Sequence, residues 1–155
     1  MMRETAGGLK QIHSDRPDCF YCSKNEKLDS LMIEAAALQV STLYVNRDQT
    51  HGGRCIVAYR RHATELFQLD RTELRLFMED VSLAAEAIYG AFRPDKMNYG
   101  IYGDLVPHLH VHLVPKYKGT EEWGEAFVNA PPSRKTLDPD GYRKIVEIIR
   151  SQLKR

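Results

Sequence analysis

Short segments with strand-like patterns dominate the first third of the chain. Apolar and polar side chains alternate over residues 40–45, and an apolar run occupies 55–59, so each segment predicts a strand. A polar loop with two glycines separates them, which indicates a hairpin. A strand at about 30–35 would pair with the first of these, although the alanines at 35–37 also suit a helical turn. The charged segment 24–29 is interpreted as a turn.

One long helix and one shorter helix are predicted farther along. The spacing of Asp70 and Glu73 is typical of a capping box, and it opens a helix expected over about 71–91. Its core stripe is expected to consist of apolar residues at helical spacing: Leu74, Phe77, Met78, Val81, Ala84, Ala85 and Ile88. The pair Asp138-Pro139 predicts a C-terminal helix. The apolar stripe of that helix is Tyr142, Ile145, Val146, Ile149 and Leu153.

A third hairpin is predicted between the two helices. Residues 97–102 read as a strand, Gly103-Asp104 turns the chain, and 107–115 alternates histidine with aliphatic residues. Successive side chains of a strand point to opposite faces. One face would therefore carry His108, His110 and His112, and the other Leu109, Val111 and Leu113.

The order of these elements predicts an α+β domain with an antiparallel sheet, one long helix and a C-terminal helix. A chain of 155 residues fits a single domain. Residues 18–155 are assigned to that domain, because residues 1–17 are polar, contain glycine and lack a period, which is typical of a flexible leader.

Charge and composition narrow the choice of partner. The net charge of +1 provides no global field for a nucleic-acid polymer, so an anionic ligand must be recognised by local groups. A small phosphate ester fits this better than a polymer. No apolar run approaches the roughly 18 residues of a membrane span. We therefore expect a cytoplasmic protein that binds neither membranes nor nucleic acid.

Two of the three cysteines form the motif Cys19-Phe20-Tyr21-Cys22. In a cytoplasmic chain this argues against a disulfide framework and leaves three interpretations: a zinc half-site, a redox dithiol, or two small buried side chains. A redox dithiol is expected near a βαβ unit, which the pattern does not contain. A zinc half-site requires two further ligands, and the sequence offers His62 and His108.

Three histidines in strict alternation are unusual on a half-solvated strand, which more often carries Thr, Lys or Glu. The alternatives are a polar face by chance, a metal site, since histidine is the commonest metal ligand, and nucleophilic chemistry at phosphorus. A neutral imidazole suits the last role, because it can attack an anionic phosphorus centre and then depart again.

The segment His108-Leu-His-Val-His-Leu-Val114 resembles the defining His-φ-His-φ-His-φ-φ pattern of the histidine-triad (HIT) family, in which φ is apolar. The resemblance implies that His110 attacks the α-phosphorus of a nucleotide and carries a nucleotidyl-imidazole intermediate. His112 lies one step farther along the same face of the strand, where it is expected to donate a hydrogen bond to the phosphate oxygens or to bridge to the departing group. The resemblance also implies a homodimer with two-fold symmetry, with Trp123 and its neighbours reaching toward the partner.

Further roles follow from the same resemblance. Asn46 takes the place of the residue that hydrogen-bonds the ribose, Asn98 matches a phosphate-contacting asparagine, and Asp104 lies in the loop that contacts phosphate. Arg54 stands where the family usually has histidine. Without the resemblance, Asn46 would be interpreted as a turn residue and Arg54 as a solvated charge.

Family members that begin with a Cys-x-x-Cys motif hold a structural zinc. By position, the ligands here would be Cys19, Cys22, His62 and His108. The first histidine of the triad would then belong to the metal site, and the other two to the chemistry.

Three functions remain open at this point. The first is a nucleotide hydrolase or nucleotidyl transferase acting on a phosphate ester, a phosphoramidate or a dinucleoside polyphosphate. The second is a metal enzyme that uses the three histidines as ligands, which the absence of an acidic residue within the triad disfavours. The third is a non-catalytic nucleotide-binding module.

Overall fold

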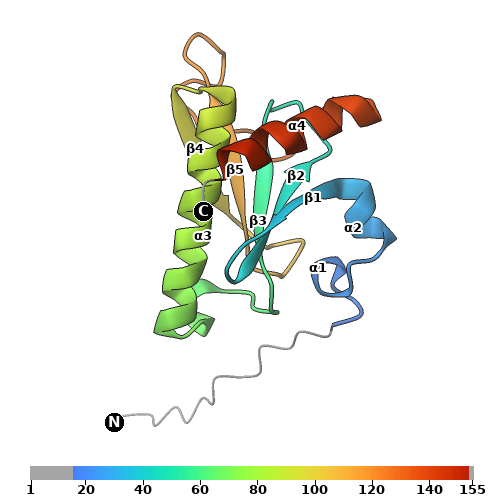
Figure 1. Ribbon diagram of the computed structural model, residues 1–155, viewed down its shortest axis with the longest axis vertical. Helices are drawn as coiled ribbons and strands as arrows, with labels where there is room; N and C mark the ends of the chain where they lie inside the picture. Colours follow the sequence, from blue (N-terminus) through green and yellow to red (C-terminus); the bar gives the residue numbers. More distant parts are fainter. Residues whose placement is uncertain (1–15, 154–155) are drawn as a thin grey trace.

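The computed structural model describes residues 16–153. Its centre is a five-stranded antiparallel sheet with the strand order β1-β2-β3-β5-β4 (Figure 1). The strands are β1 (Met32–Ala37), β2 (Ser41–Asn46), β3 (Cys55–Tyr59), β4 (Lys96–Ile101) and β5 (His110–Lys116). The predicted α+β class and all three hairpins are confirmed, and the alanines at 35–37 belong to a strand.

Within residues 16–153, five helical segments accompany the sheet, namely α1 (Phe20–Ser23), α2 (Glu26–Leu31), the 3-10 turn η1 (Leu66–Gln68), α3 (Arg71–Phe92) and α4 (Pro139–Gln152). The turn predicted over 24–29 is wrong, because most of it forms α2. The Asn25 side chain caps this helix by accepting a hydrogen bond from the Leu28 N–H, at 3.3 Å. Six residues are too few for a helical period to stand out in the sequence.

The long helix α3 begins and ends close to the predicted positions. Asp70 accepts a hydrogen bond from the Glu73 N–H at 2.8 Å, as its N-cap position predicts. The helix runs past Gly90 to Phe92 and ends at Arg93, which has a left-handed φ of 51°. The predicted core stripe is correct at five positions, Phe77, Val81, Ala84, Ala85 and Ile88, and Leu74 packs against the core as a partly buried side chain. Met78 was predicted wrongly, because it lies beside the stripe and is 43% exposed.

The two faces of the sheet have different coverings. Helices α3 and α4 contribute to the larger core together with Leu109, Val111 and Leu113, and Figure 1 shows α3 beside the sheet and α4 crossing it. The opposite face has a smaller apolar cluster that includes Tyr21 of α1 and Leu28 of α2. The histidines of β5 belong to this second face.

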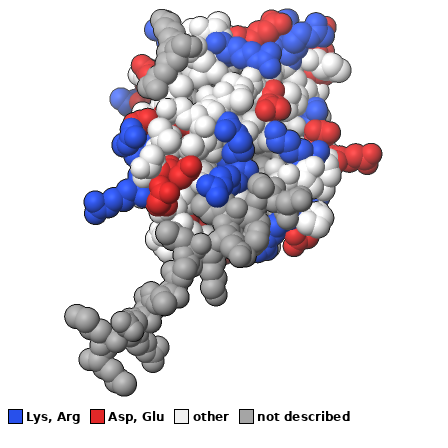
Figure 2. Space-filling view, turned by 60° about the horizontal axis from the view of Figure 1, so that its bottom comes forward, with Lys and Arg blue, Asp and Glu red and all other residues white. Residues whose placement is uncertain are grey.

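Lysine and arginine side chains alternate with acidic ones over the face drawn in Figure 2. Recognition of an anion therefore depends on individual groups, as expected from the small net charge. No helix within 16–153 is long and apolar enough to cross a membrane. The predicted leader, 1–17, lies almost entirely outside the described residues, so the boundary at 18 stays a prediction.

Candidate active site and metal centre

The histidine-bearing strand lies inside the sheet. β5 pairs with β3 on one side, where Ala58 is opposite His110, and with β4 on the other, where Gly100 is opposite His112. The predicted alternation is confirmed: Leu109, Val111 and Leu113 are in the core, and the histidines occupy the other face. His108 precedes the first residue of β5, so the regular strand is shorter than the predicted 107–115. All three histidines are buried, with at most 8% of each residue exposed.

His110 has one ring nitrogen held by a hydrogen bond and the other ring nitrogen available. Its Nδ1 lies 2.5 Å from the carbonyl oxygen of His108. Because a carbonyl only accepts, Nδ1 carries the proton and donates it, which leaves the Nε2 lone pair available. Burial lowers the pKa of His110, and the charge of Arg54 lowers it further, so the imidazole is neutral at pH 7. The ring of Tyr21 lies 5.2 Å from the imidazole and keeps it in place.

His112 has the opposite tautomer. Nη2 of Arg54 lies 3.0 Å from its Nδ1. A guanidinium only donates hydrogen bonds, so Nδ1 is the acceptor and the proton resides on Nε2. Burial, followed by the charges of Arg54 and His110, lowers the pKa of His112 to about 3. His112 is therefore a neutral donor of one N–H.

Arg54 is fixed from several sides. It is 3% exposed, so the interpretation of this residue as a solvated charge is wrong. Nη1 donates to the Asn129 carbonyl and Nη2 to the Asn129 side-chain oxygen, each at 2.8 Å. The Phe127 ring lies 5.3 Å from the guanidinium. Within the described residues, Nε of Arg54 is buried without a hydrogen-bond partner.

A cavity of about 430 Å³ lies beside this arginine. Asn46, Arg54 and Asn129 line it together with Leu31, Arg47 and Arg134. Its size lies within the range of small-molecule sites. The Asn46 oxygen accepts a hydrogen bond from the Asp48 N–H at 3.1 Å, which fixes the side chain at the end of β2.

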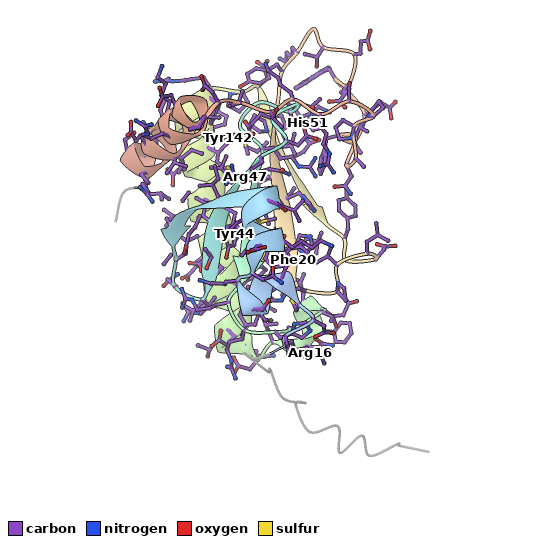
Figure 3. The ribbon with its side chains drawn as sticks, turned by 90° about the vertical axis from the view of Figure 1, so that its right-hand side faces the viewer. Arg16, Phe20, Tyr44, Arg47, His51 and Tyr142 are labelled. Carbon is purple, nitrogen blue, oxygen red and sulfur yellow. The ribbon has the colours of Figure 1, made fainter. Side chains whose placement is uncertain are left out.

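The wall of this cavity beside α4 is built by Arg47 and Tyr142. The guanidinium of Arg47 lies 5.4 Å from the Tyr142 ring, and the Tyr142 hydroxyl donates to the Arg47 carbonyl at 2.6 Å. Figure 3 shows both residues far from Arg16, which lies at the opposite end of the molecule. Residues that follow β5 in sequence, such as Asn129, Arg134 and Tyr142, therefore form this cavity together with residues that precede β3, such as Asn46 and Arg47.

Of the predicted substrate ligands, Asn46 lines this cavity, His112 contacts Arg54 at its side without lining it, and Asn98 and Asp104 lie elsewhere. Asn98 pairs with Val114 and lines a separate cavity of about 290 Å³ with Lys96, Lys116 and Trp123. Asp104 is exposed in the loop between β4 and β5. Neither side chain lines the cavity beside Arg54, so their contacts with a substrate stay predictions.

The two cysteines of the Cys-x-x-Cys motif meet two histidines. One ligand atom from each of Cys19, Cys22, His62 and His108 lies within 4.8 Å of all the others. The Sγ–Nδ1 distances are 3.3 Å for Cys19–His108, 3.3 Å for Cys22–His62 and 3.6 Å for Cys22–His108. The two Nδ1 atoms are 3.3 Å apart. Among residues 16–153, no other group of this kind is found.

These distances fit a tetrahedral zinc ion. Zn–S bonds of about 2.3 Å and Zn–N bonds of about 2.05 Å give tetrahedral edges of about 3.6 Å between sulfur and nitrogen and about 3.3 Å between nitrogens. The Nε2–H of His108 donates to the Tyr59 carbonyl at 2.7 Å, which leaves Nδ1 as the metal-facing atom. Burial and the neighbouring Cys19 raise the pKa of Cys22 to about 12, so its thiolate needs a cation beside it.

The three triad histidines do not converge on one point. Nδ1 of His108 faces the cysteines, Nδ1 of His110 faces a carbonyl, and Nδ1 of His112 faces a guanidinium. This arrangement argues against a metal centre formed by all three. His108 faces the cluster that could hold a metal ion, whereas His110 and His112 are neutral imidazoles outside it.

Three residues of the site had no sequence signal strong enough to identify them. Tyr21 stands inside the Cys-x-x-Cys motif, where its ring packs on His108 and His110. Phe127 and Asn129 lie in an irregular segment, and only the folded chain brings them to Arg54.

The comparisons agree with the geometry. The model of the HIT domain matches residues 37–119. An uncharacterized HIT-like protein of Mycoplasma genitalium is 29% identical over 101 residues, which are 61% of this chain and 69% of that protein.

Solved structures of histidine triad proteins share the fold. One from Bradyrhizobium japonicum has a TM-score of 0.73 at 22% identity, over 84% of this chain and 96% of that one. A hypothetical histidine triad nucleotide-binding protein of Sulfolobus tokodaii has a TM-score of 0.67 at 22% identity, over 87% and 91%. A zinc-bound histidine triad family protein of Mycobacterium smegmatis has a TM-score of 0.62 at 19% identity, over 88% and 93%.

The matched segment covers more than half of the chain and includes the complete triad and the strands that position it. With the predicted fold present and the histidines arranged as described, the chain is a member of the HIT family.

Proposed function

We propose that this protein cleaves a nucleoside phosphate ester, anhydride or phosphoramidate at the α-phosphorus through a nucleotidyl intermediate on His110. The carrying observation is the hydrogen bond from His110 Nδ1 to the His108 carbonyl, because it fixes the tautomer with Nε2 free. The Sulfolobus tokodaii relative, described as nucleotide-binding, supports the ligand class.

The first half-reaction forms a bond between Nε2 of His110 and the α-phosphorus. The bond from phosphorus to the leaving group breaks, and its electron pair departs with that group. The Nδ1 proton stays on the imidazole, where the His108 carbonyl stabilises the developing positive charge. The Nε2–H of His112, whose ring centroid is 5.0 Å from that of His110, donates to a phosphate oxygen.

The second half-reaction releases the nucleotide. Water, or another acceptor, attacks phosphorus and the P–N bond breaks, returning the electron pair to Nε2 of His110. With water, the product is a nucleoside monophosphate and a proton passes to solvent. The low pKa of His110 makes the imidazole a good leaving group in this step.

The nucleoside would occupy the cavity beside Arg54. Asn46 lines it from the end of β2, where its amide can hydrogen-bond ribose hydroxyls. Arg54 lines the same cavity and also contacts His112. It would therefore lie between the ribose, which Asn46 would bind, and the phosphate, which His112 would bind.

The Cys19, Cys22, His62 and His108 cluster would hold a structural zinc ion. A zinc ion with four protein ligands has no open position for substrate and contributes folding energy. Here it would anchor α1, whose Tyr21 packs on His110. The zinc-bound relative from Mycobacterium smegmatis supports this assignment.

A homodimer would form along β4, the edge strand beside the triad strand. Tyr99 is 52% exposed and Ile101 41%, and an exposed apolar edge strand invites pairing. Trp123, 39% exposed, would extend toward the partner. Sedimentation at several concentrations tests the dimer, and a Tyr99→Lys variant should be a monomer if this edge is the interface.

The proposed reaction is tested by trapping the intermediate. Wild-type protein and the His110→Ala and His112→Ala variants are mixed with a reactive nucleoside phosphorofluoridate, then digested for mass spectrometry. A nucleoside-monophosphate mass is expected on the His110 peptide of the wild type. The His112 variant should form the same adduct about 10²–10³-fold more slowly, and the His110 variant should form none.

An adduct on His112, or wild-type turnover by His110→Ala, would contradict the assignment of roles. Nucleotide binding without any turnover or adduct would favour the non-catalytic binding module instead.

A further inference from the structure

We infer that Arg54 makes this site selective for leaving groups that depart without a proton, namely the phosphate or polyphosphate end of an anhydride, over the amine of a phosphoramidate. This inference rests on the proposed function and names its substrate class. It starts from the contact between Arg54 and His112, in which Nη2 lies 3.0 Å from Nδ1.

That contact leaves His112 with a single proton, on Nε2. Because every nitrogen of a guanidinium is a donor, Arg54 cannot accept a proton from His112 or stabilise its protonated form. If His112 gave its only proton to a leaving group, an imidazolate would remain, and this is not formed near neutral pH. His112 can therefore hydrogen-bond a phosphate oxygen, but it has no proton to transfer.

Arg54 cannot easily move away to relax this constraint. Asn129 accepts hydrogen bonds from both of its terminal nitrogens, and the Phe127 ring lies against the guanidinium. With 3% of the residue exposed, a guanidinium that left Asn129 and Phe127 would give up two hydrogen-bond acceptors and a ring contact that stabilise its charge in this buried position. The donor at Nδ1 of His112 is thus a fixed part of the site.

Leaving groups differ in what they require. When the P–O bond of an anhydride breaks, the electron pair stays on a phosphate oxygen, which is stable as an anion at pH 7. When the P–N bond of a phosphoramidate breaks, the pair stays on nitrogen, which must receive a proton to leave as an amine. A site whose histidine cannot supply that proton loses the contribution of general acid catalysis, about 10²–10⁴-fold, for the amine of a phosphoramidate and for the alcohol of an ester, but not for a phosphate.

The test compares two substrate series that share one nucleotidyl group. Adenosine and guanosine dinucleoside polyphosphates are measured against the corresponding 5′-phosphoramidates, and kcat/KM is determined for each. For the wild type we expect the anhydrides to be faster by about 10²-fold or more. Arg54→Lys keeps a charged donor and should preserve the ratio. Arg54→His removes the permanent charge and should lower the ratio at least about tenfold, by restoring part of the acid catalysis.

Arg75→Met is the matched control, since Arg75 is an exposed arginine on α3 paired with Glu79, and it should leave the ratio unchanged. Nitrogen-15 NMR of His112 gives a readout independent of turnover, with the proton expected on Nε2 in the wild type.

The Tyr102 ring lies 5.7 Å from that of His112. Comparable turnover of both series would mean that another group, such as the Tyr102 phenol, protonates the amine, and would overturn the inference while leaving the proposed function intact. A proton found on Nδ1 would overturn it as well. If neither series is turned over and no adduct forms on His110, the proposed function fails and the inference fails with it.

Discussion

The carboxylate of Asp80, in the middle of α3, accepts a hydrogen bond from the Ser41 hydroxyl at the start of β2, at 2.7 Å. The same carboxylate accepts from the backbone N–H of Val40 at 2.9 Å and of Gln39 at 3.1 Å. Asp80 is fully buried. With the Gln39 side-chain amide, which donates at 3.3 Å, Asp80 therefore replaces water for four donors at the turn between β1 and β2.

Replacing Asp80 by alanine is expected to lower the free energy of unfolding by about 1–3 kcal/mol, because the buried Ser41 hydroxyl and the partly buried N–H groups of the turn lose their acceptor. Urea denaturation measures this, and Asp80→Asn, which keeps one oxygen acceptor, should lose less. A loss below about 1 kcal/mol for the alanine variant would show that the turn holds without the carboxylate.

Zinc removal should loosen the N-terminal helices while leaving the sheet folded. Protein purified without chelator is expected to contain about one zinc ion per chain, the stoichiometry of one four-ligand site. Cys22→Ser should lose the metal and melt at a lower temperature, whereas Cys55→Ser, at a buried cysteine outside the cluster, should keep the metal. A metal-free wild type with an unchanged melting temperature would disprove a structural zinc.

Asn46→Ala should raise KM and change kcat little, since a ribose contact distant from phosphorus stabilises the bound substrate and the transition state alike. Asn46→Asp is the control, because it keeps an oxygen that can accept from the Asp48 N–H and from a ribose hydroxyl. A lower kcat at constant KM would give Asn46 a role in the chemical step instead.

The pH dependence of stability should report the burial of His112. Its pKa is about 3 in the folded chain, compared with about 6.5 for an unfolded histidine. Between these values the unfolded chain binds the extra proton, so stability is fully present above about pH 6.5 and falls as the pH drops toward 3. Comparison with His112→Gln isolates this group, and the wild type should show a slope steeper by up to about 1.4 kcal/mol per pH unit. Parallel curves would mean that His112 protonates in the folded state.

Much of the fold is predictable from the sequence, because strands and amphipathic helices leave a periodic pattern. The helix begun by Asp70 and the alternating segment around His110 are long enough for such a pattern to be unambiguous. Helix α2 was missed because only Leu28 among its six residues is fully buried. Met78 was misplaced because a sequence pattern does not give the width of the buried stripe, which depends on the neighbouring elements.

The candidate site is predictable to a smaller extent. The ligand set around Cys19 and the alternation around His110 are local motifs, and the family resemblance assigns their roles. The environment of Arg54 is not local, because its partners Phe127 and Asn129 come from an irregular segment without a period. Such contacts depend on tertiary packing, which the sequence pattern does not encode directly.

Arg54 and Asn129 are 75 positions apart, and Asn129 lies beyond the segment that matches the HIT domain. Each residue depends on the other. Without Asn129, Arg54 would be a buried charge with fewer hydrogen-bond acceptors, and without Arg54, the Asn129 side-chain oxygen would lose the donor that it contacts here. We therefore expect the two residues to be retained together or replaced together among related sequences. Relatives with arginine at the position of Arg54 should have a side chain that accepts hydrogen bonds at the position of Asn129. Relatives with histidine at the position of Arg54 should show no such preference at the position of Asn129. Such paired inheritance would mark a branch of the family that shares this arrangement around its last triad histidine.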